Sequence, residues 1–226
     1  LELTKPVATA VVPISAGRHI YKREPSFPIA VACDPAFNFV YEANIRYLHH
    51  LGEVTYFSPL ADTSLPDAGF VYLPGGYPEL YLAALSATRP MLQSIRRYVE
   101  SGGKLLAECG GMMYLCDEIR DKNGDVYPMA GVLHQSATME NMKLRLGYRT
   151  LLYNETRLKG HEFHYSRLVE QQNPLPSCAV AYTAKGVETD TPLYHYKNVW
   201  AGYTHLYWAD PVGNEWFTKF VIDGNT

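Results

Sequence analysis

The chain has 226 residues, of which 47% are hydrophobic and 19% charged, and its formal net charge is −3 at pH 7. This length and apolar content suffice for a buried core without staples, and the charge excludes the basic footprint of a protein that binds nucleic acid or an anionic membrane. No apolar run is long enough to span a bilayer and no signal peptide is visible, so we expect a cytoplasmic protein that acts on a small metabolite.

Residues 1–26 contain three prolines and show no sustained periodicity. We expect them to form a linker or a tail left from a preceding domain, and residues 27–226 to form one domain. The chain begins with Leu-Glu-Leu-Thr rather than with Met, so we interpret it as a processed or excised piece of a longer protein.

The first part of the domain alternates strands with helices. Three short apolar runs predict strands at 27–33, 53–57 and 69–73. Asp34-Pro35 suits the start of a helix, and apolar residues spaced by three and four over 37–51 predict an amphipathic helix that ends at Gly52. Such alternation predicts a parallel sheet with helices on both faces.

A glycine-rich turn, Pro74-Gly75-Gly76-Tyr77-Pro78-Glu79, ends the third strand. Its glycines permit a sharp change of direction, and its second proline suits the first turn of a helix. A further amphipathic helix is predicted over 91–99, closed by Gly102-Gly103, and the apolar run 104–108 predicts a fourth strand.

Beyond residue 116 helix signals become scarce. Strand-like segments occur at 126–133, 144–153, 177–183 and 199–207, and one helix is predicted over 216–222. We therefore expect an α/β fold, a three-layer sandwich with a mostly parallel central sheet, whose later strands are partly antiparallel.

Cys109 stands where the fourth strand ends and a segment of helical character begins with Gly110-Gly111. A cysteine at a sharp strand-to-helix turn is typical of a nucleophile elbow. At a helix N-terminus the unpaired N–H groups would favour the reactive thiolate. The alternative is a buried cysteine that only fills the core, since free cysteines are among the most buried residues.

A cysteine nucleophile needs a base for its proton and donors for the oxyanion that forms on the carbonyl. The Gly75-Gly76 and Cys109-Gly110 turns both lie at carboxyl ends of strands, where the sites of open α/β sheets gather. Their backbone N–H groups could therefore converge on one oxygen. The alternative is that Gly75 and Gly76 only form a turn.

Two histidine contexts compete for the role of base. His164 lies in the segment Gly-His-Glu-Phe-His-Tyr-Ser (160–166), and His205 lies in an apolar run after Gly202; composition alone does not choose between them. His161 and His164 could bind metal only on a helix and with a third ligand, neither of which is indicated. The cysteines form no Cys-x-x-Cys pair, so we expect no metal site and no disulfide framework.

Four segments, in this order, carry a resemblance: the Pro-Gly-Gly-Tyr-Pro-Glu turn, Ala-Glu-Cys-Gly-Gly-Met-Met-Tyr-Leu (107–115), the 160–166 segment and Gly-Tyr-Thr-His (202–205). Together they resemble the C-terminal glutaminase domain of cobyrinic acid a,c-diamide synthases, class I glutamine amidotransferases of the cobyrinic/cobyric acid synthase type. The resemblance covers most of the predicted domain. It implies a flavodoxin-like fold and hydrolysis of L-glutamine to glutamate and ammonia.

The resemblance also implies roles for individual residues. Cys109 would attack the side-chain amide of glutamine, His205 would be its base, and Gly76 and Gly110 would supply the oxyanion N–H groups. Further residues would line the substrate site: Gly75, Tyr77, Glu79 and His164. Most class I members carry a glutamate two residues after the histidine, but this chain has Tyr207 there, with Asp210 as a further candidate. A Cys-His dyad, or a histidine oriented by some other group, is therefore expected.

The resemblance implies a partner as well. The chain contains no Gly-x-x-x-x-Gly-Lys-Ser/Thr phosphate loop. We expect no cofactor in this domain, and ATP and Mg²⁺ in an N-terminal synthetase domain. There the ammonia would amidate the a and c carboxylates of cobyrinic or hydrogenobyrinic acid, a corrinoid bound mainly outside this domain.

Two other functions stay open. The domain could be another hydrolase with a cysteine elbow, such as a peptidase or deglycase of the same superfamily, or a docking module that has lost catalysis. The presence of both Cys109 and His205 weighs against the second alternative, although a fold alone does not prove an activity.

Overall fold

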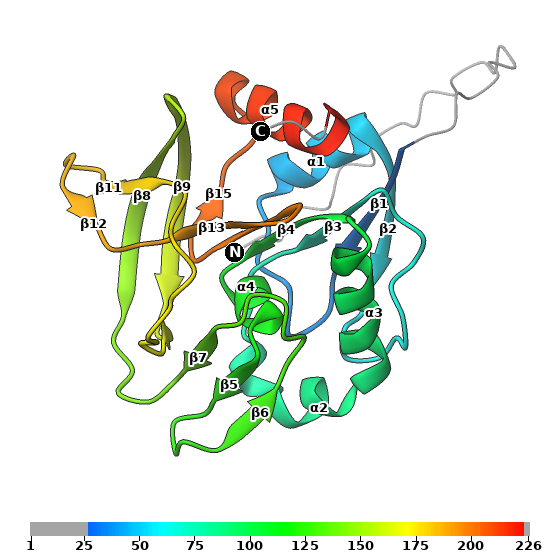
Figure 1. Ribbon diagram of the computed structural model, residues 1–226. Coiled ribbons are helices and arrows are strands. Elements are labelled where there is room, and N and C mark those ends of the chain that lie inside the picture. The colour runs from blue at the N-terminus through cyan, green and yellow to red at the C-terminus, as the bar shows by residue number, and fades with distance from the viewer. Residues whose placement is uncertain (1–26, 224–226) are drawn as a thin grey trace, which may run out of the picture.

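The computed structural model describes residues 27–223, so the predicted linker at 1–26 lies outside the described residues. Six strands form a central sheet in the order β13-β14-β4-β3-β1-β2 (Figure 1). Their bounds are β1 Phe27–Ala32, β2 Gly52–Phe57, β3 Phe70–Leu73, β4 Lys104–Glu108, β13 Leu193–Tyr196 and β14 Val199–Gly202. All neighbours pair in parallel except β13 and β14, which confirms the mostly parallel sheet.

Helices cover both faces of this sheet (Figure 1). The helices are α1 Glu42–Leu51, α2 Leu82–Ala87, α3 Arg89–Glu100, α4 Gly110–Leu115 and α5 Pro211–Thr218. Successive side chains of a strand point to opposite faces. In β1, Ala30 and Ala32 pack with the cluster that includes α3 and α4, whereas Ile29 and Val31 pack with the cluster of α1 and α5. The result is the predicted three-layer sandwich.

Aromatic side chains fix α5 against the sheet. Trp208 stacks on Phe217, with ring centroids 4.2 Å apart, and Trp200 meets Trp216 edge to face at 5.3 Å. Burial of each such side chain contributes roughly 1.5–3 kcal/mol. Trp208 lies three residues after His205, so this packing also anchors the chain that carries that histidine.

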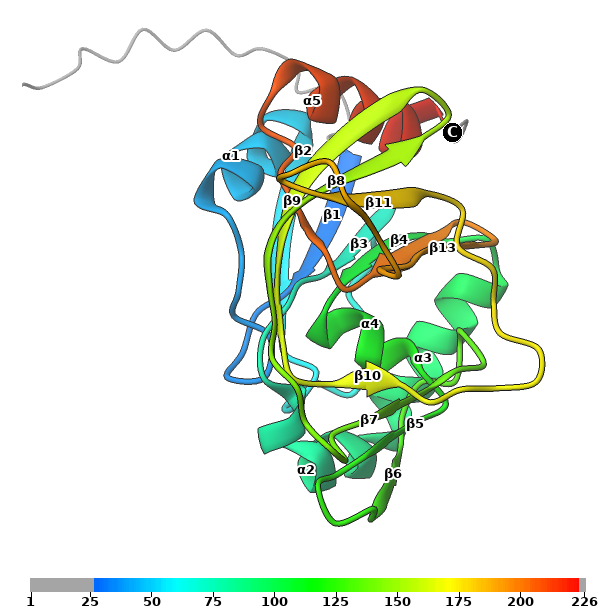
Figure 2. The same ribbon diagram turned by 90° about the vertical axis from the view of Figure 1, so that its left-hand side faces the viewer.

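The later strands form two smaller sheets. The first has the order β12-β11-β8-β9-β15, and the second has the order β10-β7-β5-β6. Their bounds are β5 Glu118–Arg120, β6 Val126–Pro128, β7 Ser136–Thr138, β8 Arg145–Tyr153, β9 Thr156–His164, β10 Arg167–Leu168, β11 Val180–Thr183, β12 Glu188–Thr189 and β15 His205–Leu206. The long β8–β9 hairpin curves along one side of the molecule (Figure 2), and most pairings here are antiparallel, as predicted.

The first helix begins later than its apolar spacing predicts. Instead of capping a helix, the Asp34 side chain accepts hydrogen bonds from the N–H groups of Ala36 and Phe37 and closes a tight turn. The N–H of Phe39 then donates to the carbonyl of Gly75 at 3.0 Å. Residues 37–41 are therefore mostly extended and bring aromatic rings to the glycine-rich turn, and α1 starts only at Glu42.

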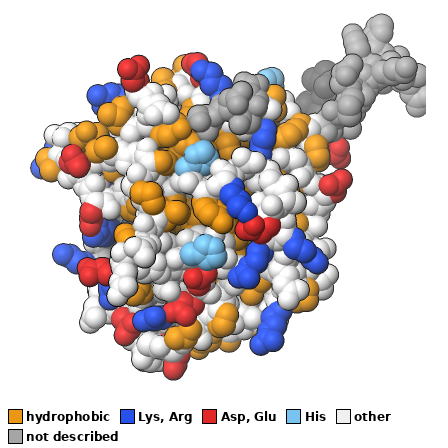
Figure 3. Space-filling model, viewed as in Figure 1, with side chains coloured by type: hydrophobic (Ala, Val, Ile, Leu, Met, Phe, Trp, Pro, Cys, Tyr) orange, Lys and Arg blue, Asp and Glu red, His pale blue; other side chains and the backbone are white. Residues whose placement is uncertain are grey.

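The surface carries mixed charges. On the face shown in Figure 3, basic and acidic side chains are interspersed, and apolar side chains gather between two histidines. Within residues 27–223, every helix is too short or too polar to cross a membrane.

Candidate active site

Cys109 occupies the turn between β4 and α4 with φ 49° and ψ −106°. A residue with a side chain rarely adopts a positive φ, and such strain concentrates at functional turns. Gly111 lets the helix start against the neighbouring strand, because a Cβ there would lie 2.1 Å from the carbonyl oxygen of Leu73. This is the strand, sharp turn and helix that the sequence predicts.

The two glycine turns meet beside the cysteine. A Cβ on Gly110 would lie 3.2 Å from the backbone nitrogen of Gly76, so the backbones of these residues are in close contact. Gly76 itself is pressed against Ala36, whose carbonyl oxygen would be 2.1 Å from an added Cβ. Backbone N–H groups of both turns are therefore close enough to serve one small acceptor.

The thiol of Cys109 is buried, with 4% of the residue exposed, and donates to the carbonyl of Phe163 at 3.9 Å. Burial, and after it the charge of Glu79, raise its pKa to about 12, although the Gly110 N–H opposes both. The expectation of a favoured thiolate is thus wrong for the unliganded protein. Desolvation outweighs the short six-residue helix, so the thiol needs a base.

His205 lies on β15, and its imidazole packs against Gly75. A Cβ on Gly75 would lie 2.1 Å from His205 Cε1, so only glycine leaves room for the ring. The ring of Phe39 covers the imidazole at a centroid distance of 4.3 Å. Burial, and after it His161 and His164, lower the pKa of His205 to about 3, so the imidazole is neutral at pH 7.

Glu108 is a site residue that the sequence analysis did not single out. Its side chain is buried and accepts hydrogen bonds from the Tyr72 hydroxyl at 2.7 Å and from the Leu206 N–H at 3.1 Å. Its Oε2 lies 3.9 Å from His205 Nδ1. Burial raises its pKa to about 8, against the effect of these hydrogen bonds. A charged residue at the end of an apolar strand was the available signal.

A cavity of about 20 Å³ adjoins Cys109. Its lining includes five of the residues predicted for the site, Gly76, Tyr77, Glu79, Cys109 and His164, together with Met113, Phe163, Tyr165 and Ser166. This volume is close to that of one water molecule. Tyr77 and Tyr165 are about two-fifths exposed and stand at its edge, so their movement would open it.

The 160–166 segment contributes one of its two histidines to the site. A spacing of three on strand β9 points His161 and His164 to opposite faces, so they are not a joint ligand pair. His164 Nδ1 donates to the carbonyl of Ser166 at 2.9 Å, and its ring stacks on Tyr203 at 3.8 Å. Within residues 27–223, no three His, Cys, Asp or Glu side chains group as metal ligands.

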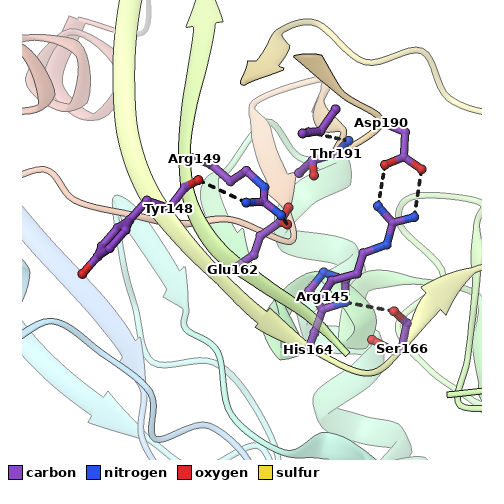
Figure 4. A network of polar contacts seen from close by, with 9 residues as sticks. Arg145, Tyr148, Arg149, Glu162, His164, Ser166, Asp190 and Thr191 are labelled. Atoms are coloured by element: carbon purple, nitrogen blue, oxygen red, sulfur yellow. Dashed lines mark hydrogen bonds and ion pairs between the residues drawn. The ribbon is translucent and has the colours of Figure 1, made fainter. Parts of the chain in front are cut away.

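A larger pocket of about 290 Å³ shares His164 and Ser166 with the cavity at Cys109. Its polar lining forms the network in Figure 4. Arg149 pairs with the fully buried Glu162 at 2.6 Å, and Arg145 binds both oxygens of Asp190, with Nη2 2.9 Å from Oδ2. The site therefore combines a buried thiol at a strained turn with a neighbouring pocket that holds charges of both signs.

A profile of the CobB/CobQ-like glutamine amidotransferase domain matches residues 28–212. The chain belongs to this family. Hydrogenobyrinate a,c-diamide synthase of Pseudomonas aeruginosa is 40% identical over 185 residues, which make up 79% of this chain and 41% of the relative. Cobyrinate a,c-diamide synthase of Fusobacterium nucleatum is 39% identical over 188 residues, 79% of this chain and 41% of the relative. The chain thus spans less than half the length of these curated relatives.

The fold of this amidotransferase domain agrees with solved structures. One described as a glutamine amidotransferase superposes with a TM-score of 0.55 at 16% sequence identity, over 85% of this chain and 98% of the other. At this identity the likeness concerns the fold alone.

In the amidotransferase domain, Tyr207 and Asp210 make their contacts with groups other than the His205 imidazole. Asp210 accepts the N–H of Gly213 at 2.8 Å as the N-cap of α5, and its other oxygen pairs with Lys159 at 3.1 Å. Tyr207 is 37% exposed and packs edge to face on Tyr41. Asp210 therefore serves the helix.

Proposed function

We propose that this domain hydrolyses L-glutamine to glutamate and ammonia, with Cys109 as nucleophile and His205 as base. One observation carries the proposal. The strained Cys109 turn lies beside the Gly76 turn, and the His205 imidazole occupies the space that a side chain at Gly75 would take. The location of Cys109, the two glycine turns and His205 at one end of the sheet, in a chain of a glutamine amidotransferase family, supports these roles.

The proposed reaction has two halves. His205 accepts the thiol proton while sulfur adds to the amide carbon, and the oxyanion accepts N–H groups of Gly76 and Gly110. The C–N bond then breaks, ammonia leaves with the proton from His205, and a thioester remains. Water, deprotonated by His205, adds to the thioester, and glutamate and the thiol are released.

The opposite pKa shifts favour a concerted first step. Burial disfavours a lone thiolate at Cys109 and a lone imidazolium at His205. When both charges form together they attract each other, and the negative charge moves on to the substrate oxygen. Resting enzyme therefore keeps a neutral thiol and a neutral imidazole until a substrate carbonyl is present.

We propose that the α-carbon end of glutamine lies toward the 290 Å³ pocket. That end is a zwitterion, and the pocket lining includes Arg145 and Arg167 together with Glu162. His164 Nδ1 donates to a carbonyl, so its buried Nε2 is an acceptor for the substrate α-ammonium group. Tyr77 and Glu79 line the cavity at Cys109, where the side-chain amide would sit.

The destination of the ammonia is part of the same proposal. The relatives are named for amidating cobyrinate or hydrogenobyrinate, and they are more than twice as long as the matched region. In this proposal a synthetase domain binds ATP, Mg²⁺ and the corrinoid, activates the a and c carboxylates, and receives ammonia made here.

The test is a glutaminase assay with Cys109→Ala. Loss of the nucleophile should lower the rate of glutamate release by at least about 10³-fold, because no thioester can form. Cys33→Ser, which changes an exposed cysteine, should retain the wild-type rate. A covalent glutamyl adduct should be detected by mass spectrometry in wild type and Cys33→Ser alone.

Glutamate release that persists in Cys109→Ala would remove this cysteine from the mechanism. If the wild-type protein does not hydrolyse glutamine but cleaves a peptide or a glycated amino acid, the result would favour its assignment to the other hydrolases of the superfamily.

A further inference from the structure

The imidazole of His205 has one nitrogen with no satisfied partner. Among the residues that the structure describes, no group lies within hydrogen-bonding distance of His205 Nδ1, although this atom is fully buried. A buried polar atom without a partner costs roughly 1–3 kcal/mol. The Glu108 carboxyl faces it, with Oε2 3.9 Å away, so a shift of about 1 Å would complete a hydrogen bond.

Glu108 has the capacity to accept that bond. Its Oε1 accepts the Leu206 N–H and its Oε2 accepts the Tyr72 hydroxyl, which leaves lone pairs on both oxygens. These two donors hold the carboxyl in place from β3 and β15. The residue is also adjacent to Cys109 in the chain, so the strand that presents the nucleophile presents the carboxyl as well.

The chemistry requires a particular tautomer. To take a thiol proton, His205 needs one nitrogen free of hydrogen and the other protonated. An ionised carboxylate can only accept, so a Glu108 bond at Nδ1 leaves the proton on Nδ1 and the lone pair on Nε2. When the imidazolium forms, the same carboxylate stabilises its charge.

We propose that Glu108 is the positioning residue for His205 and takes the role that a glutamate two residues after the histidine would otherwise have. During the reaction Nδ1–H donates to the Glu108 carboxylate, and Nε2 exchanges the proton with Cys109 and with the departing ammonia. This inference rests on the proposed glutaminase function. Tyr207 occupies the position two residues after His205 and packs on Tyr41 with 37% of the residue exposed, so it does not fill this role.

The ionisable neighbours of the pair come from several elements. Tyr72 on β3 donates to the carboxyl, and Cys109 follows it in the chain. Burial, and after it the charge of Glu108, raise the pKa of Tyr41, which precedes α1. His161 and His164 on β9 oppose a positive charge on His205. Glu108 is the carboxyl that faces Nδ1 of His205, and its deprotonated form selects the active tautomer.

Glu108→Gln tests the proposal kinetically. The amide N–H₂ would donate to Nδ1 and force the proton onto Nε2, so kcat should fall about 10²- to 10⁴-fold with KM within about threefold of wild type. Glu118→Gln makes the same chemical change on β5, away from the site, and should leave kcat unchanged. A kcat for Glu108→Gln within about threefold of wild type would overturn the proposal.

A spectroscopic readout separates this proposal from the glutaminase assignment. In ¹⁵N-histidine NMR of the whole chain, with the His205 signal identified from His205→Asn, wild type should show Nδ1–H and an unprotonated Nε2 above the Glu108 pKa of about 8. The Nε2–H form should grow as pH falls through that value, and Glu108→Gln should show it throughout.

A wild-type signal that remains Nε2–H above that pH would contradict the role of Glu108 even if glutamine is hydrolysed. The expected tautomer change in a chain that fails to hydrolyse glutamine would instead support the pairing and remove only the assigned reaction. Because the wild-type titration needs no variant, a folding defect in Glu108→Gln leaves the test decisive.

Discussion

At the scale of single residues, the imidazole position depends on a missing side chain. Gly75 does not have a positive φ, so alanine can adopt its backbone conformation, but a Cβ there would lie 2.1 Å from His205 Cε1. The ring is held on its other side by Phe39. A shift of the imidazole away from residue 75 would therefore also change its distance from Glu108.

Gly75→Ala should therefore lower kcat by about 10- to 100-fold, because displacement of a catalytic group by about 1 Å costs this much. The free energy of unfolding should change by much less than the activation free energy that corresponds to this loss of kcat. Gly186→Ala is the matched control: it has a φ of +77° and open space around it, so it should cost about 1 kcal/mol of stability and no activity. Steady-state kinetics and urea unfolding of both variants check this, and full activity in Gly75→Ala would show that the ring can yield.

Residues with local signatures were predictable from the sequence, and residues with long-range partners were not. The Cys109 turn and its glycines follow from adjacent residues, so their geometry was expected. Glu108 gains its importance only because β14 pairs with β4 and carries the chain on to His205. The pairing of two strands so far apart in the chain could not be predicted from one sequence.

At the scale of elements, α5 illustrates how a short helix near the chain end holds the site. Its apolar face packs on Trp200 and Trp208, and Asp210 caps its first turn. The strand that carries His205 leads directly into it. The Asp210 cap therefore stabilises the same segment of chain that carries the imidazole.

Asp210→Ala should lower the free energy of unfolding by about 0.5–2 kcal/mol, or the melting temperature by roughly 2–4 °C per kcal/mol, because an N-cap acceptor is lost. Asp210→Asn keeps a cap acceptor and loses only the exposed pair with Lys159, so it should remain within about 0.5 kcal/mol of wild type. Thermal unfolding compares the three proteins. Equal losses in both variants would assign the effect to the ion pair and not to the cap.

Element types followed from periodicity, and element boundaries did not. The amphipathic α3 and the strands of the central sheet other than β13 were predicted because their apolar patterns are regular, whereas β13 was missed. The start of α1 was wrong because Asp34 and the Phe39 bridge hold residues 37–41 outside the helix. The six-residue α2 was missed because so short a segment has too few turns to show a period.

At the scale of the whole molecule, buried ionisable groups link stability to pH in opposite directions. Glu108 has a pKa of about 8 instead of 4.5, so the folded state binds its proton more tightly and this contribution is lost as pH rises toward 8. His205 has a pKa of about 3 instead of 6.5, so its contribution is present above pH 6.5 and lost as pH falls toward 3.

Of these two contributions, that of Glu108 changes most between pH 6.5 and 8, and it should lower the free energy of unfolding with rising pH by up to about 1.4 kcal/mol per unit. Glu108→Gln cannot ionise and should remove this slope. Urea unfolding across this range measures both proteins. An identical slope in wild type and variant would assign the pH dependence to other groups.

Cys109 and His205 belong to different sheets. Cys109 follows β4 of the central sheet, whereas His205 lies on β15, which pairs with β9 of the curved hairpin (Figure 2). Any tilt of that hairpin changes the path of the transferred proton at the sulfur. Alignment of the imidazole with the sulfur therefore depends on how the hairpin packs against the central sheet, and a substitution far from both residues can change it.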